Sequence, residues 1–271
     1  MSTSGELPPV HDLPPMEPPV LVVGDVHLGP RSPEVTEAFL AFLDGLAGRV
    51  RHLVLLGDLF DAWVGDDQRE EPTVARVLAA LGRVVASGTR VAFQAGNRDF
   101  LFRAGPGLDV DHWPDVVRTR WGERTVVLTH GDLLCTADVG YQRLRRVVRS
   151  RGFGRAARLT PGWVRRSVGK ALRGASKRTA HRAPRGVLGL DYAEARRWLE
   201  GLGAQLLVAG HVHTGVHHRL LAGGGGEVIV LRDWDRGGNA IRYDERGTQL
   251  VALEAGRPVD IAVGGGARSE G

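Results

Sequence analysis

The stretch Val20-Leu-Val-Val-Gly-Asp-Val-His27 decides the fold, because four apolar residues are followed by a glycine and then by two separated polar side chains. A short apolar run that ends at a glycine is typical of a buried strand. In Asp25-Val-His27, the two-residue period of an extended chain places both polar side chains on one face. The stretch therefore predicts a buried strand whose carboxyl end carries side chains of the metal-ligand type.

The same pattern recurs along the chain, with amphipathic helices predicted between the first strands, from Ser32-Pro33 and over residues 72–87. Short strands with glycine-rich turns are expected beyond Gly215. This order predicts an α/β layered sandwich with the sheets inside and the helices outside. Ligands bind beyond the carboxyl ends of strands in such sheets, so the polar clusters should converge. The further apolar runs and their clusters are 52–56 with Gly57-Asp58, 90–93 with Gly96-Asn-Arg-Asp99, 125–129 with His130-Gly-Asp132, and 205–209 with Gly210-His-Val-His213.

The converging side chains are carboxylates, one amide and several imidazoles, a donor set that suits borderline divalent metals. Asp58 has two oxygens and can bridge two cations, while Asn97 can ligate without adding charge. Two metals held close together clamp a phosphate and activate a water. A single Asp or His after a strand is more often a cap or turn residue. Five such clusters in a fixed order, taken together, indicate a shared metal site.

The amino-acid composition excludes several classes of protein. The chain has 271 residues, of which 42% are hydrophobic and 25% charged, as in ordinary globular domains. Its single cysteine, Cys135, excludes a disulfide framework and a cysteine-rich zinc module, and is interpreted as a packing residue. Residues 1–19 hold six of the fourteen prolines and predict a disordered leader, followed by one domain over 20–263 and a flexible tail over 264–271. The leader lacks the features of a signal peptide, so a cytoplasmic location is expected.

The charge is divided sharply between two regions. Residues 141–186 contain thirteen Arg, two Lys and no acidic residue, a charge of +15 within a chain whose net charge is +5. The rest of the chain therefore carries −10. A basic block of this kind favours phosphates, an anionic membrane surface or nucleic acid, although a solvated arginine-rich stretch is the simpler alternative. Trp163, Val164, Val168 and Leu172 recur at helical spacing among these arginines, which predicts an amphipathic basic helix.

The ordered set of strand-end motifs resembles the calcineurin-like metallophosphoesterase superfamily. The resemblance implies a four-layer α/β/β/α sandwich around a centre of two divalent metal ions. It also implies that Asp58 is the ligand shared by both metals. One metal would be held by Asp25, His27, Asp58 and His213, and the other by Asp58, Asn97, His130 and His211.

A narrower resemblance rests on Arg98, where most of the superfamily has a histidine, and on two longer stretches. Leu56-Gly-Asp-Leu-Phe-Asp-Ala-Trp-Val-Gly-Asp-Asp67 and His130-Gly-Asp-Leu-Leu-Cys-Thr-Ala-Asp-Val-Gly-Tyr-Gln142 are similar to the UDP-2,3-diacylglucosamine pyrophosphatases of lipid A synthesis. This family implies water attack on the α-phosphorus, with UMP and 2,3-diacylglucosamine 1-phosphate (lipid X) as products and Mn²⁺ as the usual metal. The catalytic residues implied are Asp58, Asn97, Arg98 and His211.

The same family has a helical cap after the Gly-Tyr-Gln segment, which implies a cap over residues 141–189 here. The cap would cover the acyl chains and meet the anionic inner membrane, making the protein a peripheral membrane protein on the cytoplasmic side. Substrate-binding positions implied by the resemblance are Arg98, Asp138, Tyr141, Arg173, Ser176 and Thr179.

Other interpretations stay open. The same site could act on another nucleotide or phosphodiester, or the basic insert could serve a nuclease. The insert has few aromatic residues for stacking on bases, so no nucleic-acid partner is expected. Arg98 has a structural alternative, a salt bridge to Asp99, and Asp132 is expected to orient a ligand histidine or a turn rather than to bind metal.

Overall fold

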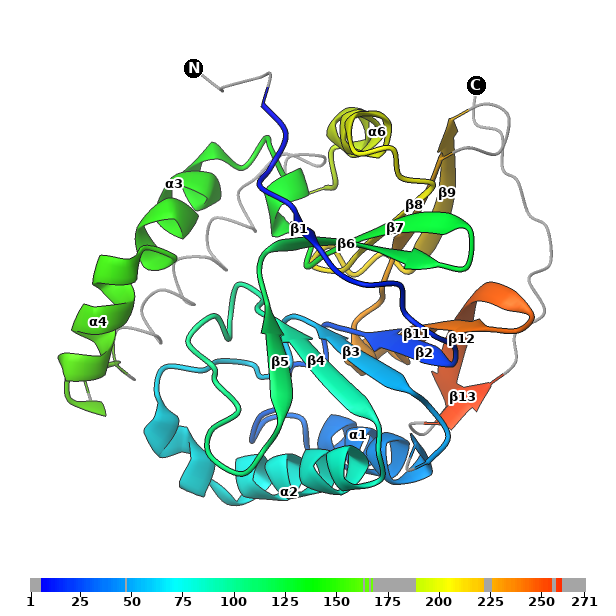
Figure 1. The fold of residues 1–271 in the computed structure, drawn as a ribbon. Helices are drawn as coiled ribbons and strands as arrows, with labels where there is room; N and C mark the ends of the chain where they lie inside the picture. The colour runs from blue at the N-terminus through cyan, green and yellow to red at the C-terminus, as the bar shows by residue number, and fades with distance from the viewer. Residues whose placement is uncertain are drawn as a thin grey trace.

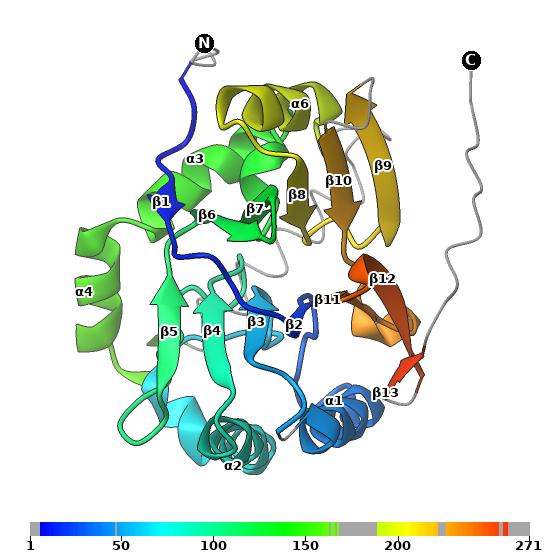
Figure 2. The same cartoon turned by 45° about the vertical axis from the view of Figure 1, so that its right-hand side comes forward.

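The fold was analysed in a computed structural model, which describes residues 6–46, 48–162, 164–165, 167, 189–221, 226–254 and 257–259. Within these residues, the strands form two sheets that face each other (Figures 1 and 2). The first sheet consists, in spatial order, of β13 (Arg257–Val259), β12 (Gly247–Glu254), β11 (Asn239–Asp244), β2 (Val20–Val23), β3 (His52–Leu56), β4 (Arg90–Gln94) and β5 (Val110–Trp113). The second consists of β1 (His11–Asp12), β6 (Val116–Trp121), β7 (Arg124–Thr129), β8 (Leu206–Ala209), β10 (Gly226–Val230) and β9 (Val216–Leu221).

Helices cover the outer faces of both sheets. The first sheet packs against α1 (Pro33–Leu46) and α2 (Pro72–Ala86), and the second against α6 (Tyr192–Gly201). Each outer layer contributes a core of its own, and a third core of side chains such as Val54, Val208 and Ile229 fills the space between the sheets. The predicted α/β/β/α layer order is confirmed.

The strands β2, β3 and β4 run parallel, as do β7, β8 and β10. These strands are apolar along most of their length because they are covered on both faces, which matches their burial in the structure. The strands predicted beyond Gly215 are partly antiparallel, since β9 pairs with β10 and β11 pairs with β12. After β10 the chain crosses from the second sheet to the first, where β11 pairs with β2.

The structure differs from the predicted disordered leader over residues 6–19. β1 pairs in parallel with β6, and the Asp12 carboxylate receives two bonds from Arg118, at 2.6 Å from Nε and 3.0 Å from Nη2. Met16 is buried in the core between the sheets. The prolines are compatible with this path because the segment lies at the edge of the second sheet, where few backbone donors are needed.

Two helices account for most of the described part of the region predicted to form the cap, residues 141–189, and we refer to this region as the cap. α3 (Val139–Val148) and α4 (Arg151–Leu159) lie beside the two sheets rather than on either outer face (Figure 1). Among the described residues, the short 3-10 helices η1 (Asp66–Glu70), η2 (Asp132–Leu134) and η4 (Trp234–Arg236) lie in the loops between the main elements. The helical positions Trp163, Val168 and Leu172, the substrate positions Arg173, Ser176 and Thr179, and the tail 264–271 lie outside the described residues. None of the described helices is long and apolar enough to span a bilayer.

Candidate dimetal centre

All seven predicted metal ligands meet at the carboxyl ends of the strands, at the boundary between the two sheets. Asp25, Asp58 and Asn97 follow β2, β3 and β4 of the first sheet. His130 follows β7 of the second sheet, and His211 and His213 follow β8. Ligand positions from both sheets therefore meet in the folded protein.

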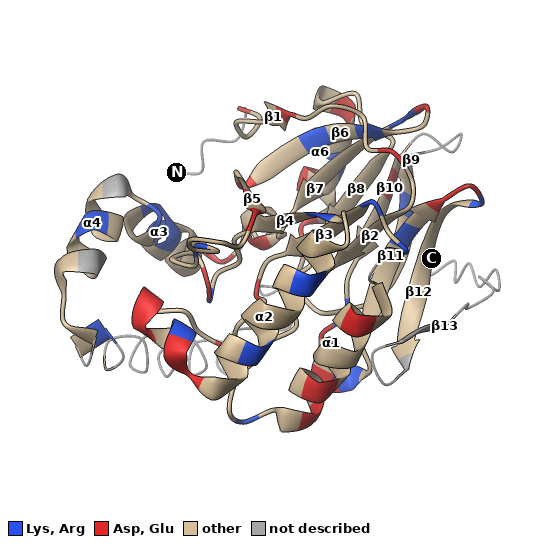
Figure 3. Cartoon of the chain, turned by 60° about the horizontal axis from the view of Figure 1, so that its bottom comes forward, with Lys and Arg blue, Asp and Glu red and all other residues tan. Residues whose placement is uncertain are grey.

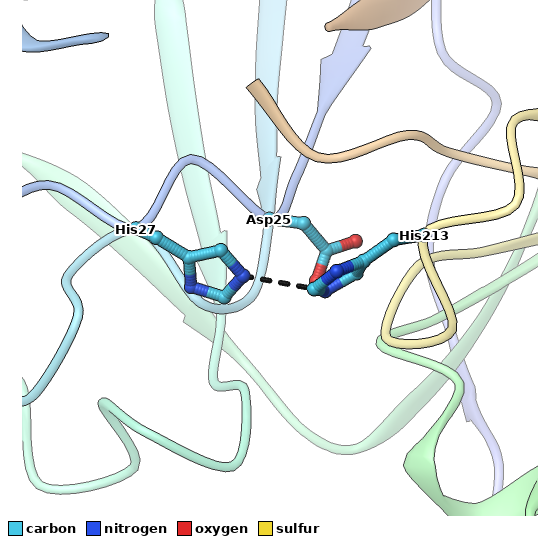
Figure 4. Close-up of side chains that lie close together, drawn as sticks. All are labelled: Asp25, His27 and His213. Carbon is cyan, nitrogen blue, oxygen red and sulfur yellow. Dashed lines mark hydrogen bonds and ion pairs between the residues drawn. The ribbon is translucent and has the colours of Figure 1, made fainter. Parts of the chain in front are cut away.

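One group of donor atoms consists of Asp25, His27 and His213, which point toward one another (Figure 4). The Nε2 atoms of His27 and His213 are 3.2 Å apart, and His213 Nε2 lies 3.3 Å from Asp25 Oδ1. A second group consists of Asp25, Asp58 and His130, and in each group the donor atoms lie within 4.8 Å of one another. Asp25 therefore borders both groups, whereas the sequence assigned it to one metal.

Asp58 lies between a histidine of the first group and one of the second, and Asn97 lies between His130 and His211. Asp58 Oδ2 lies 3.9 Å from His27 Nδ1, and its Oδ1 lies 3.8 Å from His130 Nε2. Asn97 Oδ1 lies 3.2 Å from His130 Nε2 and 3.0 Å from His211 Nδ1. Asp58 thus lies between His27 and His130, which were predicted to bind different metals. The division of the seven ligands between two metals stays a prediction.

The residues fit a metal centre on two observations. The buried Nδ1 of His27 has no hydrogen-bond partner, as a nitrogen reserved for a cation would not. In the described residues, the non-glycine positions with a left-handed backbone are Asp25, His27, Asp58, His211 and His213, with φ between 52° and 69°. A positive φ strains the backbone of a non-glycine residue, and strained residues are concentrated at functional sites. It also corrects the sequence argument, because Asp25 and His27 converge through left-handed turns and not through an extended strand.

Two glycines leave room for the ligands. Gly57 has φ +81°, and a Cβ there would collide with the His130 ring. A Cβ on Gly96 would collide with the Asp58 carboxylate. Both positions therefore require glycine because of close approach, which explains the Gly-Asp and Gly-Asn pairs in the sequence.

The electrostatics act in opposite directions on the ligand imidazoles. Burial opposes protonation of His130 and His213, but nearby carboxylates outweigh it and raise the pKa of both. Burial opposes ionisation of Asp25, but the hydrogen bond to His213 and the neighbouring imidazoles outweigh it and lower the pKa of Asp25. Burial lowers the pKa of His27 and of His211, which keeps both neutral near pH 7. Anionic oxygen and neutral nitrogen are the forms that bind cations. Burial and the nearby Asp58 charge raise the pKa of Asp99 to about 7.

Arg98 and Asp99 take separate roles, so the alternative salt bridge between them is replaced by other contacts. Arg98 donates from Nη1 to Asp61 Oδ1 at 2.9 Å, and its Nε lies 3.4 Å from Asp58 Oδ2. Asp99 is fully buried and accepts from the backbone N–H groups of Leu59 at 2.7 Å and Gly96 at 2.9 Å. Asp99 therefore fixes the two ligand-bearing loops, and Arg98 is available at the metal centre.

Asp132 connects the site to the cap. It is buried and accepts from Tyr141 Oη at 2.6 Å and from Arg145 Nε at 2.7 Å, and Arg145 also pairs with Asp115 at 2.8 Å. Burial opposes ionisation of Asp132, but the charge of Arg145 and the neighbouring His130 and His211 outweigh it and hold the pKa of Asp132 below its usual range. The sequence did not identify this network, in which a cap arginine is buried and serves the fold.

The predicted substrate positions Asp138 and Tyr141 lie at the start of the cap. Asp138 caps α3 by accepting from the backbone N–H of Tyr141 at 2.9 Å. The Tyr141 ring centroid lies 5.8 Å from that of His211, so Tyr141 borders the metal ligands. Cys135 is buried, and burial raises the pKa of its thiol to about 12, which supports packing rather than nucleophilic chemistry.

The comparisons with known proteins agree with this geometry. The family model for calcineurin-like phosphoesterases matches residues 18–215, which contain all seven ligand positions. This chain belongs to the calcineurin-like phosphoesterase family. As a member of that family it is a metal-dependent hydrolase, and the Asp and His clusters are candidate positions for the family's dimetal centre.

Relatives of this phosphoesterase carry a narrower name. The UDP-2,3-diacylglucosamine hydrolase of Pseudomonas entomophila (strain L48) is 37% identical over 240 residues, covering 87% of this chain and 99% of the relative. The protein of the same name from Pseudomonas fluorescens (strain SBW25) is 36% identical, covering 88% and 97%. A dimetal phosphatase from Danio rerio is similar in structure at 14% identity, covering 86% of this chain and 98% of that one, with a TM-score of 0.45.

Asp233 is a site residue that the sequence analysis missed. Its Oδ2 lies 3.5 Å from Nδ1 of His213, while Nε2 of the same ring faces Asp25. A carboxylate behind a ligand histidine fixes the ring and its tautomer. Asp233 stands three residues after β10, and no pattern in the sequence links it to His213.

Asp233→Ala is expected to weaken Mn²⁺ binding by roughly 10- to 100-fold, because His213 loses the group that orients it. Competition with a fluorescent chelator measures the affinity of the protein without any assay of turnover. Asp235→Ala, two residues away and exposed, is the matched control and should keep the affinity of the unaltered protein. Equal affinities in the two variants would remove Asp233 from the site.

Proposed function

We propose that this phosphoesterase hydrolyses the pyrophosphate bond of UDP-2,3-diacylglucosamine to UMP and 2,3-diacylglucosamine 1-phosphate (lipid X). The observation that carries the proposal is the combination, in one cluster, of seven donor side chains with an arginine at the position after Asn97. Relatives that match over nearly their whole length bear the corresponding name. Water attacks the α-phosphorus, its oxygen forms the new bond, and the bond to the bridging oxygen breaks, so the sugar 1-phosphate leaves.

In this proposal the ligand residues have distinct tasks. Two divalent ions, which we assign as Mn²⁺, would supply Lewis acidity and an activated water when bound by the seven ligands. Asp58 would be the ligand shared by both ions. Asn97 orients His130 and His211 through its Oδ1. Burial lowers the pKa of His211, and we place its ring beside the reacting group, where it can donate a hydrogen bond to the departing phosphate.

Besides the metal ions, Arg98 is the positive charge that we propose acts on the substrate. Its guanidinium lies between Asp58 and Asp61 and is about one-third exposed, so it can reach a phosphoryl group placed at the metal ligands. A planar, permanently charged fork matches two phosphate oxygens, and its charge offsets the charge on the phosphoryl group as the bond breaks. Asp138 and Tyr141 are proposed to contact the substrate at the base of the cap, with Arg173, Ser176 and Thr179 completing it.

The direct test of this function uses purified protein, Mn²⁺ and UDP-2,3-diacylglucosamine, with separation of the products. We expect UMP and lipid X in equal amounts, and solvent oxygen-18 in UMP because the α-phosphorus is attacked. Chelation with EDTA should stop the release, and added Mn²⁺ should restore it. Hydrolysis of an aryl phosphodiester without release of UMP would favour the alternative that the site acts on another substrate.

The cap has the composition of a surface that meets lipid. The large apolar side chains that are exposed in the described residues are Val139, Leu144, Val147 and Leu159, and all four lie on α3 or α4. Arg143, Arg146 and Arg155 are exposed on the same helices. Apolar and basic side chains together favour the interface of an anionic membrane. We propose that this face covers the acyl chains and binds the cytoplasmic surface of the inner membrane peripherally.

Replacing Arg143, Arg146 and Arg155 together by glutamine should weaken sedimentation with phosphatidylglycerol vesicles at least about tenfold, since each basic residue near such a surface contributes roughly 1 kcal/mol. Neutral phosphatidylcholine vesicles should show little binding of either protein. The matched control replaces Arg49, Arg51 and Arg90, which are exposed at the amino ends of β3 and β4 on the body. A loss of binding in the control as large as that in the cap variant would contradict the proposal.

A further inference from the structure

One carboxylate beside the candidate dimetal centre is shared by two arginines. Asp61 Oδ1 accepts from Arg98 Nη1 at 2.9 Å, and Asp61 Oδ2 accepts from Arg31 Nη2 at 2.7 Å. Arg98 Nε in turn lies 3.4 Å from Asp58, the proposed bridging ligand. The four side chains therefore form a row that leads outward from the metal ligands in the order Asp58, Arg98, Asp61, Arg31.

The loops that carry this row are joined to one another through their backbones. Leu28 donates its N–H to Leu59 O at 2.8 Å, and Asp61 donates to Leu28 O at 2.9 Å. Trp63 donates to Arg98 O at 2.8 Å. These bonds connect the loops after β2, β3 and β4 and hold the backbones of Leu28, Asp61 and Arg98 relative to one another, with Arg31 three residues beyond Leu28.

Close approach at Gly29 supports the same conclusion. A Cβ on Gly29 would lie 3.3 Å from Cβ of Asp61, tighter than most such contacts. The segment that presents Arg31 is thus packed directly against the residue that holds Arg98. Sequence reasoning gave Arg31 no role because the ion pair joins residues 30 positions apart in two different loops.

The row contains two arginines, and each of them can bind one phosphoryl group of a diphosphate. Asp61 occupies one edge of each guanidinium, and each arginine keeps further N–H groups for other oxygens. Arg98 lies beside the metal ligands, where the attacked phosphorus would be, whereas Arg31 is one residue farther out and its side chain is 68% exposed. An exposed ion pair contributes little to stability, so the pair has little value to the fold itself. A diphosphate would place its second phosphoryl group on this outer side.

We propose that Arg31 binds the second phosphoryl group of a diphosphate substrate and that Asp61 is a positioning residue for both Arg31 and Arg98. The proposal rests on the proposed function for the statement that the substrate is a diphosphate. It adds a specificity-determining contact, because a monophosphate or a simple phosphodiester has no group for Arg31 to bind. The outer guanidinium would also offset the charge that gathers on the departing phosphate.

The test compares UDP with UMP as ligands of the Mn²⁺-loaded protein by titration calorimetry. Arg31→Ala should weaken UDP binding by roughly 10-fold or more, the loss typical of a charged hydrogen bond, and change UMP binding less than twofold. Arg31→Lys should recover part of the loss, because it keeps the charge without the planar fork. Arg49→Ala, an exposed arginine on the body, should leave both affinities unchanged. Equal losses for UDP and UMP, or no loss for either, would overturn the assignment of Arg31.

Asp61 is tested by a double-mutant cycle on the same two ligands. The preference for UDP over UMP should fall in Asp61→Asn, and Arg31→Ala should then cost less than in the unaltered protein. A purely structural role for Asp61 would lower the melting temperature and leave the two substitutions additive. Because the readout is binding, a failure here is distinct from a failure of the proposed function, which would appear as absent release of UMP.

Discussion

Asp58→Ala is expected to lower the turnover of the proposed substrate UDP-2,3-diacylglucosamine by about 10³-fold or more, because both metal positions would lose the ligand that we propose they share. The carboxylate is buried and lies 3.9 Å from His27 Nδ1 at one oxygen and 3.8 Å from His130 Nε2 at the other. Metal content determined by mass spectrometry after gel filtration should fall below that of the unaltered protein. The activity measurement is the release of UMP under saturating Mn²⁺.

Two variants control this experiment. Asp58 also accepts the Arg98 backbone N–H at 2.9 Å, so Asp58→Asn, which keeps the shape, separates loss of charge from loss of the loop contact. Asp44→Ala removes an exposed carboxylate of α1 that pairs with Arg83 of α2, and it should keep full activity. Figure 3 shows acidic residues along α1 and basic residues along the neighbouring α2. Unaltered metal content and turnover in Asp58→Ala would contradict the proposed site.

Asp132→Ala is expected to reduce the free energy of unfolding by about 3–5 kcal/mol, because it leaves the buried guanidinium of Arg145 without its closest partner. Tyr141 Oη loses its acceptor in the same variant. Urea denaturation followed by circular dichroism measures the change. Limited proteolysis should cut first in α3, which Arg145 and Tyr141 attach to the body.

The double variant Asp132→Leu with Arg145→Met tests whether the lost stability comes from the unpaired buried charge of Arg145. Replacing both charges by apolar side chains removes the uncompensated charge, so much of the lost stability should return. Asp109→Ala, at an exposed position, is the surface control and should change the free energy of unfolding by less than about 0.5 kcal/mol. An Asp132→Ala variant as stable as this control would show that the buried pair does not anchor α3.

The sequence predicts most of the fold because its main strands and helices are local patterns. The runs at 20–23 and 52–56 are strands with those bounds, and the helix from Pro33 forms as expected. The convergence of the ligand positions follows from the rule on strand ends, which needs no knowledge of long-range contacts. What the rule does not give is the left-handed backbone at Asp25 and His27, since nothing in a non-glycine residue type announces it.

The predictions that fail depend on partners distant in sequence. The proline-rich segment is ordered from residue 6 because Asp12 meets Arg118 and Met16 enters the core between the sheets. The block of arginines is less uniform than its charge suggests, because Arg145 meets Asp132 and Asp115 of the body. A count of charges cannot distinguish a buried arginine from a solvated one, since the difference lies in which acidic residue the fold places opposite.

The division of the ligands between two sheets gives the apolar core between them a second role. The distance from Asp58 and Asn97 to His130 and His211 is set by the thickness of that core, to which Val54, Val208 and Ile229 contribute. Interiors are packed tightly, so one added or removed methylene there is felt as a shift of one sheet against the other. Substitutions of these apolar side chains can therefore change the distances between the candidate ligand side chains without replacing any of them.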